Sequence, residues 1–257
     1  LDSWPHFDGR RMESIVAFDA FDGFPNLVTM FFDRAASKGD RPFLWHKQDG
    51  QWQSISWRDA ARQVAGLAKS LHELGFEPGD RVMLVSENRP EWCIADLGIM
   101  AAGCITVPTY STNSERDHQH ILDDSGARGV IVSTAKLAQT LLPAVIRSSA
   151  AAHVIGMEEI SSQQAGQLST CKFSDLALGT DEDVVVARQR ASHVERSDLA
   201  CIIYTSGTGG APRGVRQHHG AILCNATGAA EVLVEDFGID EERFLSFLPL
   251  SHAYEHT

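Results

Sequence analysis

The sequence has few cysteines and no excess of basic residues. Its 5 cysteines are odd in number and widely spaced, and no two of them form a CxxC pair. This pattern disfavours a disulfide framework or a zinc site and suits reduced thiols in a cytoplasmic protein. Lys and Arg number 22 against 34 Asp and Glu, which gives a formal net charge of -12. A chain of this charge without a basic cluster repels nucleic acid, so we expect no nucleic-acid partner.

Long hydrophobic runs are also absent. The longest nearly apolar stretch, residues 97–108, is well short of the roughly 20 residues that a membrane-spanning helix needs. The N-terminus lacks a basic start followed by an apolar run, so we do not interpret it as a signal peptide. We therefore expect a cytoplasmic protein. Peripheral contact with a membrane stays an open alternative, because an apolar or basic surface patch leaves little trace in one sequence.

Short apolar strands alternate with amphipathic helices along most of the chain. The predicted strands are "RVMLVS" at 81–86, "ITVP" at 105–108, "GVIVS" at 129–133, "HVIGM" at 153–157 and "LACIIY" at 199–204. Such alternation predicts an α/β protein with layered helices and mostly parallel sheets. We predict a first α/β subdomain over residues 1–160, a linker and irregular segment over 161–198, and the start of a second sheet over 199–257.

A glycine-rich stretch, "YTSGTGGAPRGV" at residues 204–215, directly follows the last of these strands. Small residues after a strand let backbone N–H groups approach phosphate oxygens. Two common phosphate loops do not fit: GxxxxGK[ST] lacks its lysine, and GxGxxG begun at Gly207 meets Pro212 at its third glycine. The stretch therefore predicts a phosphate-binding loop of another class, in which hydroxyls and a guanidinium supply the donors.

The segment "DLACIIYTSGTGGAPRGV" resembles the nucleotide-phosphate loop of the adenylate-forming superfamily, whose usual pattern is YTSGTTGxPKGV. That superfamily includes acyl-CoA synthetases, firefly-type luciferases and the adenylation domains of nonribosomal peptide synthetases. Gly209 replaces the usual Thr and removes a hydroxyl, and Arg213 replaces the usual Lys. Residues 56–92 and 101–133 resemble the preceding family segments in the same order, and His219 occupies the position of the histidine that follows the loop.

The C-terminal stretch "FLPLSHAYEH" at residues 247–256 is similar to the family motif at the acyl pocket. Its form, with Glu255 three residues after His252, is most similar to long-chain fatty acyl-CoA synthetases. His256 stands where many of those enzymes carry arginine. The resemblance implies the N-terminal domain of an adenylate-forming enzyme, incomplete at the C-terminus.

The resemblance also implies an activity. A carboxylic acid would react with ATP and Mg²⁺ to give acyl-AMP, and the acyl group would pass to coenzyme A. It assigns catalytic roles to His252 and Arg213, and we assign no metal-ligating residue. It implies cofactor contacts for Thr205, Ser206, Gly207, Thr208, Gly209, Gly210, Arg213 and Glu255.

Two alternatives to an acyl-CoA synthetase stay open. The chain could serve as a non-catalytic or degenerate nucleotide- or acyl-binding module, or it could belong to an acyl-AMP ligase that serves a carrier protein. We expect small-molecule partners, namely fatty acid, ATP and coenzyme A. We also expect the chain alone to be inactive as the N-terminal portion of a larger synthetase, with an exposed strand edge near residues 244–248.

Overall fold

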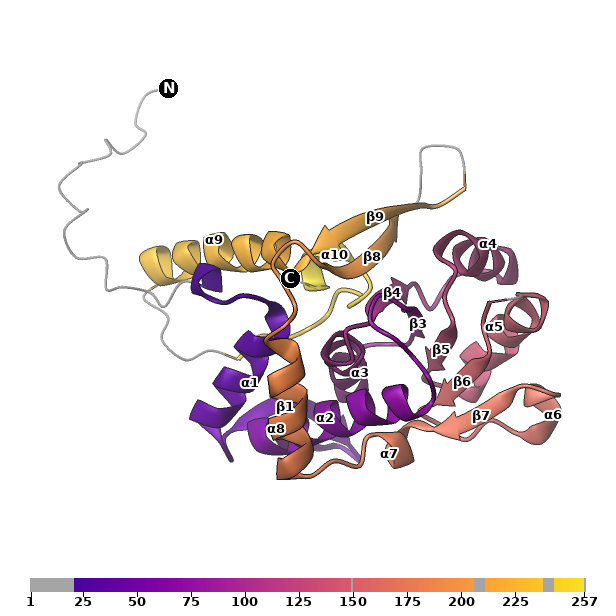
Figure 1. Ribbon diagram of the computed structural model, residues 1–257, viewed down its shortest axis with the longest axis horizontal. Coiled ribbons are helices and arrows are strands. Elements are labelled where there is room, and N and C mark those ends of the chain that lie inside the picture. The colour runs from indigo at the N-terminus through magenta and orange to yellow at the C-terminus, as the bar shows by residue number, and fades with distance from the viewer. Residues whose placement is uncertain (1–20, 149, 206–210, 238–242, 257) are drawn as a thin grey trace, which may run out of the picture.

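A seven-stranded sheet forms the centre of the molecule (Figure 1). The structure is a computed structural model that describes residues 21–148, 150–205, 211–237 and 243–256. The strand order is β7-β6-β5-β3-β4-β8-β9, and neighbouring strands are parallel except for β8 and β9, which are antiparallel. The strands are β3 (Arg81–Val85), β4 (Ile105–Thr109), β5 (Gly129–Val132), β6 (His153–Gly156), β7 (Ser169–Lys172), β8 (Leu199–Thr205) and β9 (Arg213–His218).

Helices cover both faces of this sheet. They are α1 (Leu27–Lys38), α2 (Trp57–Glu73), α3 (Pro90–Ala101), α4 (Glu115–Ser125), α5 (Ala135–Arg147), α6 (Ser162–Ala165), α7 (Phe173–Leu176), α8 (Asp181–Ala191), α9 (His219–Phe237) and α10 (Ala253–His256). A short 3-10 helix, η1 (Phe21–Gly23), precedes them, and β1 (Pro42–Gln48) pairs with β2 (Gln51–Ser56) in a separate hairpin. The expected layered α/β fold is confirmed.

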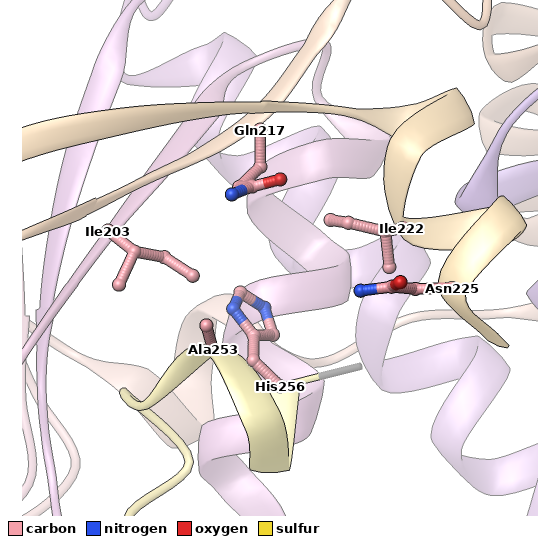
Figure 2. Close-up of a pocket in the computed structure, with 6 residues that line it drawn as sticks. All are labelled: Ile203, Gln217, Ile222, Asn225, Ala253 and His256. Carbon is pink, nitrogen blue, oxygen red and sulfur yellow. The ribbon is translucent and has the colours of Figure 1, made fainter. Parts of the chain in front are cut away.

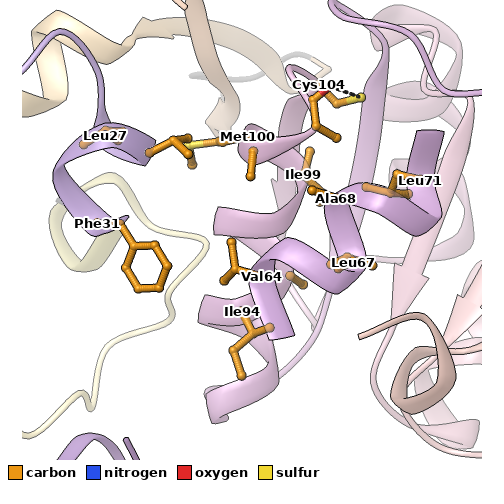
Figure 3. Close-up of a cluster of buried hydrophobic side chains, with 14 of the residues drawn as sticks. Leu27, Phe31, Val64, Leu67, Ala68, Leu71, Ile94, Ile99, Met100 and Cys104 are labelled. Carbon is orange, nitrogen blue, oxygen red and sulfur yellow. Dashed lines mark hydrogen bonds between the residues drawn. The ribbon is translucent and has the colours of Figure 1, made fainter. Parts of the chain in front are cut away.

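Side chains that alternate along β3 divide the core into two halves. Val82 and Leu84 pack among the residues of α1, α2, α3 and α8, and Figure 3 shows part of this cluster, including Val64, Leu67 and Ile99. Met83 and Val85 pack on the opposite face against α4 and α5. A strand presents successive side chains to opposite faces, so an entirely apolar strand predicts a sheet covered on both sides.

Turns and helix caps form where local sequence signals predict them. Asp49 and Gly50 lie between β1 and β2 with φ values of 48° and 80°, which is the turn expected at this dipeptide. The Ser56 side chain accepts a hydrogen bond from the backbone N–H of Asp59 at the start of α2. This contact satisfies one of the orphan donors of the first helical turn.

The prediction that a second sheet begins at residue 199 is wrong. β8 lies beside β4 in the central sheet, with Cys201 opposite Thr106. Both residues are fully buried, so burial on both faces draws the strand into the existing core. The expected linker over residues 161–198 contains α6, β7, α7 and α8. Only two residues of α8, Ala187 and Ala191, are buried, which explains why its sequence lacks an apolar face. The domain boundaries themselves stay a prediction.

The strand expected near residues 244–248 is not observed. Residues 243–248 form neither helix nor strand. Their apolar side chains are nevertheless exposed, with Phe244 at 74%, Leu245 at 73% and Phe247 at 75%. Within the residues that the structure describes, no helix is both long and apolar enough to cross a membrane.

Candidate functional site

The ends of the glycine-rich loop lie at the tip of the hairpin of β8 and β9. Thr205, the last residue of β8, pairs with Arg213, the first residue of β9, and both are exposed. The structure therefore brings these two predicted residues together. Ser206, Gly207, Thr208, Gly209 and Gly210 lie outside the described residues. The hydroxyl and guanidinium at the loop ends are donors suited to phosphate oxygens, and the carboxyl end of a parallel-sheet strand is the usual place for such a site.

Two side-chain contacts connect both ends of this loop to α4. The Tyr204 hydroxyl donates a hydrogen bond of 2.6 Å to Asp124 Oδ2 at the start of the loop. His120 Nε2 lies 2.8 Å from the carbonyl oxygen of Pro212 at its other end. The His120 and Tyr204 rings meet edge to face, with centroids 6.4 Å apart. Helix α4 thus holds the hairpin tip on both sides.

Tyr204 remains a neutral hydrogen-bond donor in this position. Burial raises the pKa of its phenol, and the adjacent Asp124 carboxylate raises it further. The sequence reasoning missed both α4 contacts. His118 and His120 lie two positions apart on α4 and differ in environment: His118 is buried, whereas His120 reaches the loop.

The acyl-pocket motif forms a turn followed by α10. The N–H of His252 donates to the carbonyl of Pro249 over 2.8 Å, and the His252 side chain is exposed. Ser251 beside it is buried at 4% exposure. Glu255 lies within α10, but its side chain is outside what the structure describes. The structure therefore places His252 on a different segment from the loop ends, with its ring accessible.

Asn88, just before α3, anchors the start of this motif. Its side-chain Nδ2 donates to the carbonyl of Leu248 over 2.6 Å and to Ser246 Oγ over 2.9 Å. Its Oδ1 accepts from the N–H of Leu250 over 3.0 Å. One amide side chain thus fixes three points of an otherwise irregular segment.

A buried ion pair anchors the other end. His256 Nε2 donates to Asp96 Oδ2 of α3 over 2.9 Å, and the two side chains are 6% and 8% exposed. The other ring nitrogen, Nδ1, lies 3.9 Å from Cys201 Sγ of β8, and the Trp92 ring meets the imidazole edge to face at 5.3 Å. Burial lowers the pKa of His256, but Asp96 outweighs it through charge and hydrogen bond, raising the pKa to about 10.

The sequence contained a signal that could have predicted a buried partner for Asp96. Asp96 is the sole charged residue in the apolar stretch 92–101 of α3. A lone charge on a buried helix requires a partner.

His219 is a structural residue in this arrangement. It begins α9, is 2% exposed, and its Nδ1 accepts a hydrogen bond from the N–H of Leu27 over 3.4 Å. Leu27 is the first residue of α1, where backbone N–H groups lack helical partners. Burial lowers the pKa of His219 to about 4, which keeps the ring neutral and able to accept.

A small cavity of about 40 Å³ lies between the loop-bearing hairpin and the acyl-pocket motif. Figure 2 shows its lining side chains around the His256 ring, and they are Ile203, Gln217, Ile222, Asn225, Ala253 and His256. They come from β8, β9, α9 and α10. The space admits a water molecule or a small polar group. No cluster of three or more His, Cys, Asp or Glu residues suited to a metal ion occurs in the described part of the chain.

Comparisons with known proteins identify the family of the chain. The family model of the AMP-binding enzyme matches residues 31–257. The chain is 31% identical to long-chain-fatty-acid–CoA ligase FadD15 of Mycobacterium tuberculosis, over 89% of this chain and 37% of that protein. It is 30% identical to long-chain-fatty-acid–CoA ligase ACSBG2 of Xenopus laevis, over 89% of this chain and 31% of that protein. The chain thus spans about a third of the length of these relatives.

Solved structures share the fold. A Rhodopseudomonas palustris protein described as a long-chain-fatty-acid CoA ligase superposes with a TM-score of 0.68 at 22% identity, covering 91% of this chain and 53% of that one. A fatty acyl-adenylate ligase from L. pneumophila superposes with a TM-score of 0.64 at 20% identity, covering 90% and 36%. The family match over residues 31–257 shows that the chain belongs to the AMP-binding enzyme family.

Proposed function

We propose that the protein carrying this chain is an AMP-forming acyl-CoA synthetase that activates long-chain fatty acids. The main structural support is the pairing of Thr205 with Arg213 at the tip of the β8–β9 hairpin. The relatives of the chain include long-chain-fatty-acid–CoA ligases. In the first half-reaction a carboxylate oxygen attacks the α-phosphorus of ATP and pyrophosphate leaves. In the second, the thiol of coenzyme A attacks the acyl carbon and AMP leaves.

The loop residues would stabilise the departing pyrophosphate. Arg213 supplies a permanent positive charge to the β- and γ-phosphates, and Thr205 supplies a hydroxyl donor from the opposite strand. We propose backbone and side-chain donors for Ser206, Gly207, Thr208, Gly209 and Gly210 on the basis of the sequence pattern. Mg²⁺ would accompany ATP and neutralise phosphate charge.

His252 would meet the acyl carboxylate. Its exposed ring lies on a turn whose two ends are fixed by Asn88 and by His256. A fixed turn holds its side chains in one geometry, and such positioning lowers the activation barrier of a two-substrate reaction. We propose a nucleotide contact for Glu255 from the motif alone. The protein would act in the cytoplasm on small-molecule substrates.

Exchange of labelled pyrophosphate into ATP tests this proposal, with acids of graded chain length. We expect exchange by the complete protein that rises with chain length, and no exchange by the 257-residue chain alone, because the chain covers 37% of FadD15. Exchange without acyl-CoA release on addition of coenzyme A would favour an acyl-AMP ligase. Absence of exchange by the folded complete protein with every acid would favour the non-catalytic binding module.

A further inference from the structure

The segment that bears His252 straddles helix α3. Asn88, before the first turn of α3, holds the segment at Ser246, Leu248 and Leu250. Asp96, in the middle of α3, holds it again at His256. His252 lies between these two attachments. The position of its ring therefore depends on both of them.

The contact between His256 and Asp96 is a buried ion pair. Asp96 Oδ1 has no hydrogen-bond partner within the described part of the chain, so this carboxylate relies on His256 through Oδ2. A buried carboxylate that loses its cationic partner is strongly destabilised. Loss of the His256 charge would therefore drive Asp96 toward water or protonation, and α10 would separate from α3.

The same imidazole contacts the strand that leads to the loop. His256 Nδ1 lies 3.9 Å from Cys201, four residues before Thr205 on β8, and the small cavity around the ring is walled by both strands of the hairpin. His256 thus lies where the loop-bearing strand, helix α3 and the acyl-pocket motif meet.

The titratable groups around the Asp96–His256 pair come from three elements. Helix α3 supplies Asp96 and Cys93, and burial raises the pKa of the Cys93 thiol to about 12. Strand β8 supplies Cys201, whose pKa burial also raises. Helix α9 supplies His219, which is neutral because burial lowers its pKa to about 4. Gln217 and Asn225 face the ring as neutral amides. Among the described residues, the Asp96 carboxylate is thus the charged group that faces His256.

We propose that the buried Asp96–His256 ion pair is a positioning device that holds the His252 turn against β8 and α3, so that acid binding depends on the charge of His256. This inference rests on the proposed function. Because the charge of His256 depends on pH, the strength of the ion pair depends on pH as well. The pair is charged at neutral pH and loses its charge as the pH rises through about 10.

The test compares the complete wild-type protein with the variants His256→Arg and His193→Arg in pyrophosphate exchange between pH 7 and pH 10. A guanidinium keeps its charge across this range. About half of the His256 rings lose their charge by pH 10, so we expect kcat/KM for the fatty acid to fall about twofold more in the wild type than in His256→Arg as the pH rises. The KM for ATP should follow the same pH dependence in both proteins. His193 is exposed, so His193→Arg should behave as wild type.

Equal pH profiles for wild type and His256→Arg would overturn the inference. Amide hydrogen exchange of residues 249–256 gives a second readout that does not depend on activity. Because it is measured in the wild type, it remains informative even if His256→Arg folds poorly. Protection that falls with pH in the wild type, after correction for intrinsic rates, supports the device, and pH-independent protection overturns it. Absence of exchange activity in the wild type contradicts the proposed function, and the hydrogen-exchange result then decides the inference on its own.

Discussion

Tyr204 donates a 2.6 Å hydrogen bond to Asp124, and this contact ties the strand before the glycine-rich loop to α4. The carboxylate acceptor strengthens the bond relative to one between neutral groups. His120 makes the matching contact at Pro212 on the far side of the loop. The helix therefore holds the hairpin tip at both ends, and the α4 contacts should influence nucleotide binding without contacting the nucleotide.

Removal of the phenol tests this role. Tyr204→Phe keeps the buried ring but leaves Asp124 without its donor, so we expect a loss of about 1 kcal/mol in the free energy of unfolding. The KM for ATP should rise severalfold while the KM for the acid stays the same. Urea denaturation and pyrophosphate exchange measure the two effects. Tyr110→Phe serves as the matched control, and an ATP effect of equal size in that variant would contradict the role.

Arg213 should matter through its charge. Arg213→Ala should lower pyrophosphate exchange roughly hundredfold, because a donor to the leaving phosphates is lost where charge develops. Arg213→Lys keeps the positive charge and should retain most of the activity. Arg216 lies on the same strand and is also exposed. If Arg216→Ala were as damaging as Arg213→Ala, a general effect of positive charge on β9 would replace the specific role.

Buried histidines should make the protein labile to acid. Burial lowers the pKa of His118 to about 4 and that of His219 to about 4, from an ordinary value of 6.5. Their neutral forms favour the folded state, so this stability is complete above pH 6.5 and is lost as the pH falls toward 4. Urea denaturation at about pH 7 and about pH 5 measures the loss.

His118→Leu isolates one of these contributions. His118 is 1% exposed, and its Nδ1 has no hydrogen-bond partner in the described ranges. We expect the variant to lose less stability than the wild type does over the same change of pH. His193→Gln, at an exposed position, should match the wild type. An unchanged acid response in His118→Leu would contradict the assignment.

Close backbone approach should forbid a side chain at Gly179. A Cβ there would lie 2.0 Å from the carbonyl oxygen of Arg62 in α2, and backbone atoms cannot yield as a flexible side chain can. Gly179→Ala should therefore destabilise the fold by about 3 kcal/mol. Gly228 lies in α9, and a Cβ added there would have no atom within 4 Å, so Gly228→Ala should be neutral or stabilising. Equal denaturation midpoints for the two variants would contradict this packing argument.

The sequence predicted the fold where patterns are local. Uninterrupted apolar strands such as β3 and the cap at Ser56 identify elements from their own residues. The neighbour of β8 was not predicted correctly, because strand pairing depends on burial contributed by β4, which lies far earlier in the chain. Helix α8 was missed because most of its surface is polar and only two alanines are buried.

The candidate site shows the same division. A contiguous motif predicts the chemistry of Thr205 and Arg213, and in the structure the two residues pair across β8 and β9. Asp96 and His256 are 160 positions apart, and their pairing depends on how α10 folds back onto α3. A lone Asp in an apolar helix indicates that a partner exists but does not say where it lies.

The most direct measurement is fatty-acid-dependent exchange of labelled pyrophosphate into ATP by the complete protein, with Arg213→Ala and Arg216→Ala alongside. We predict exchange that increases with acyl chain length, falls roughly hundredfold in Arg213→Ala and persists in Arg216→Ala. Absence of exchange by the folded wild-type protein with every acid would contradict the account, because the pairing of Thr205 with Arg213 would then belong to a protein without acyl-adenylate chemistry.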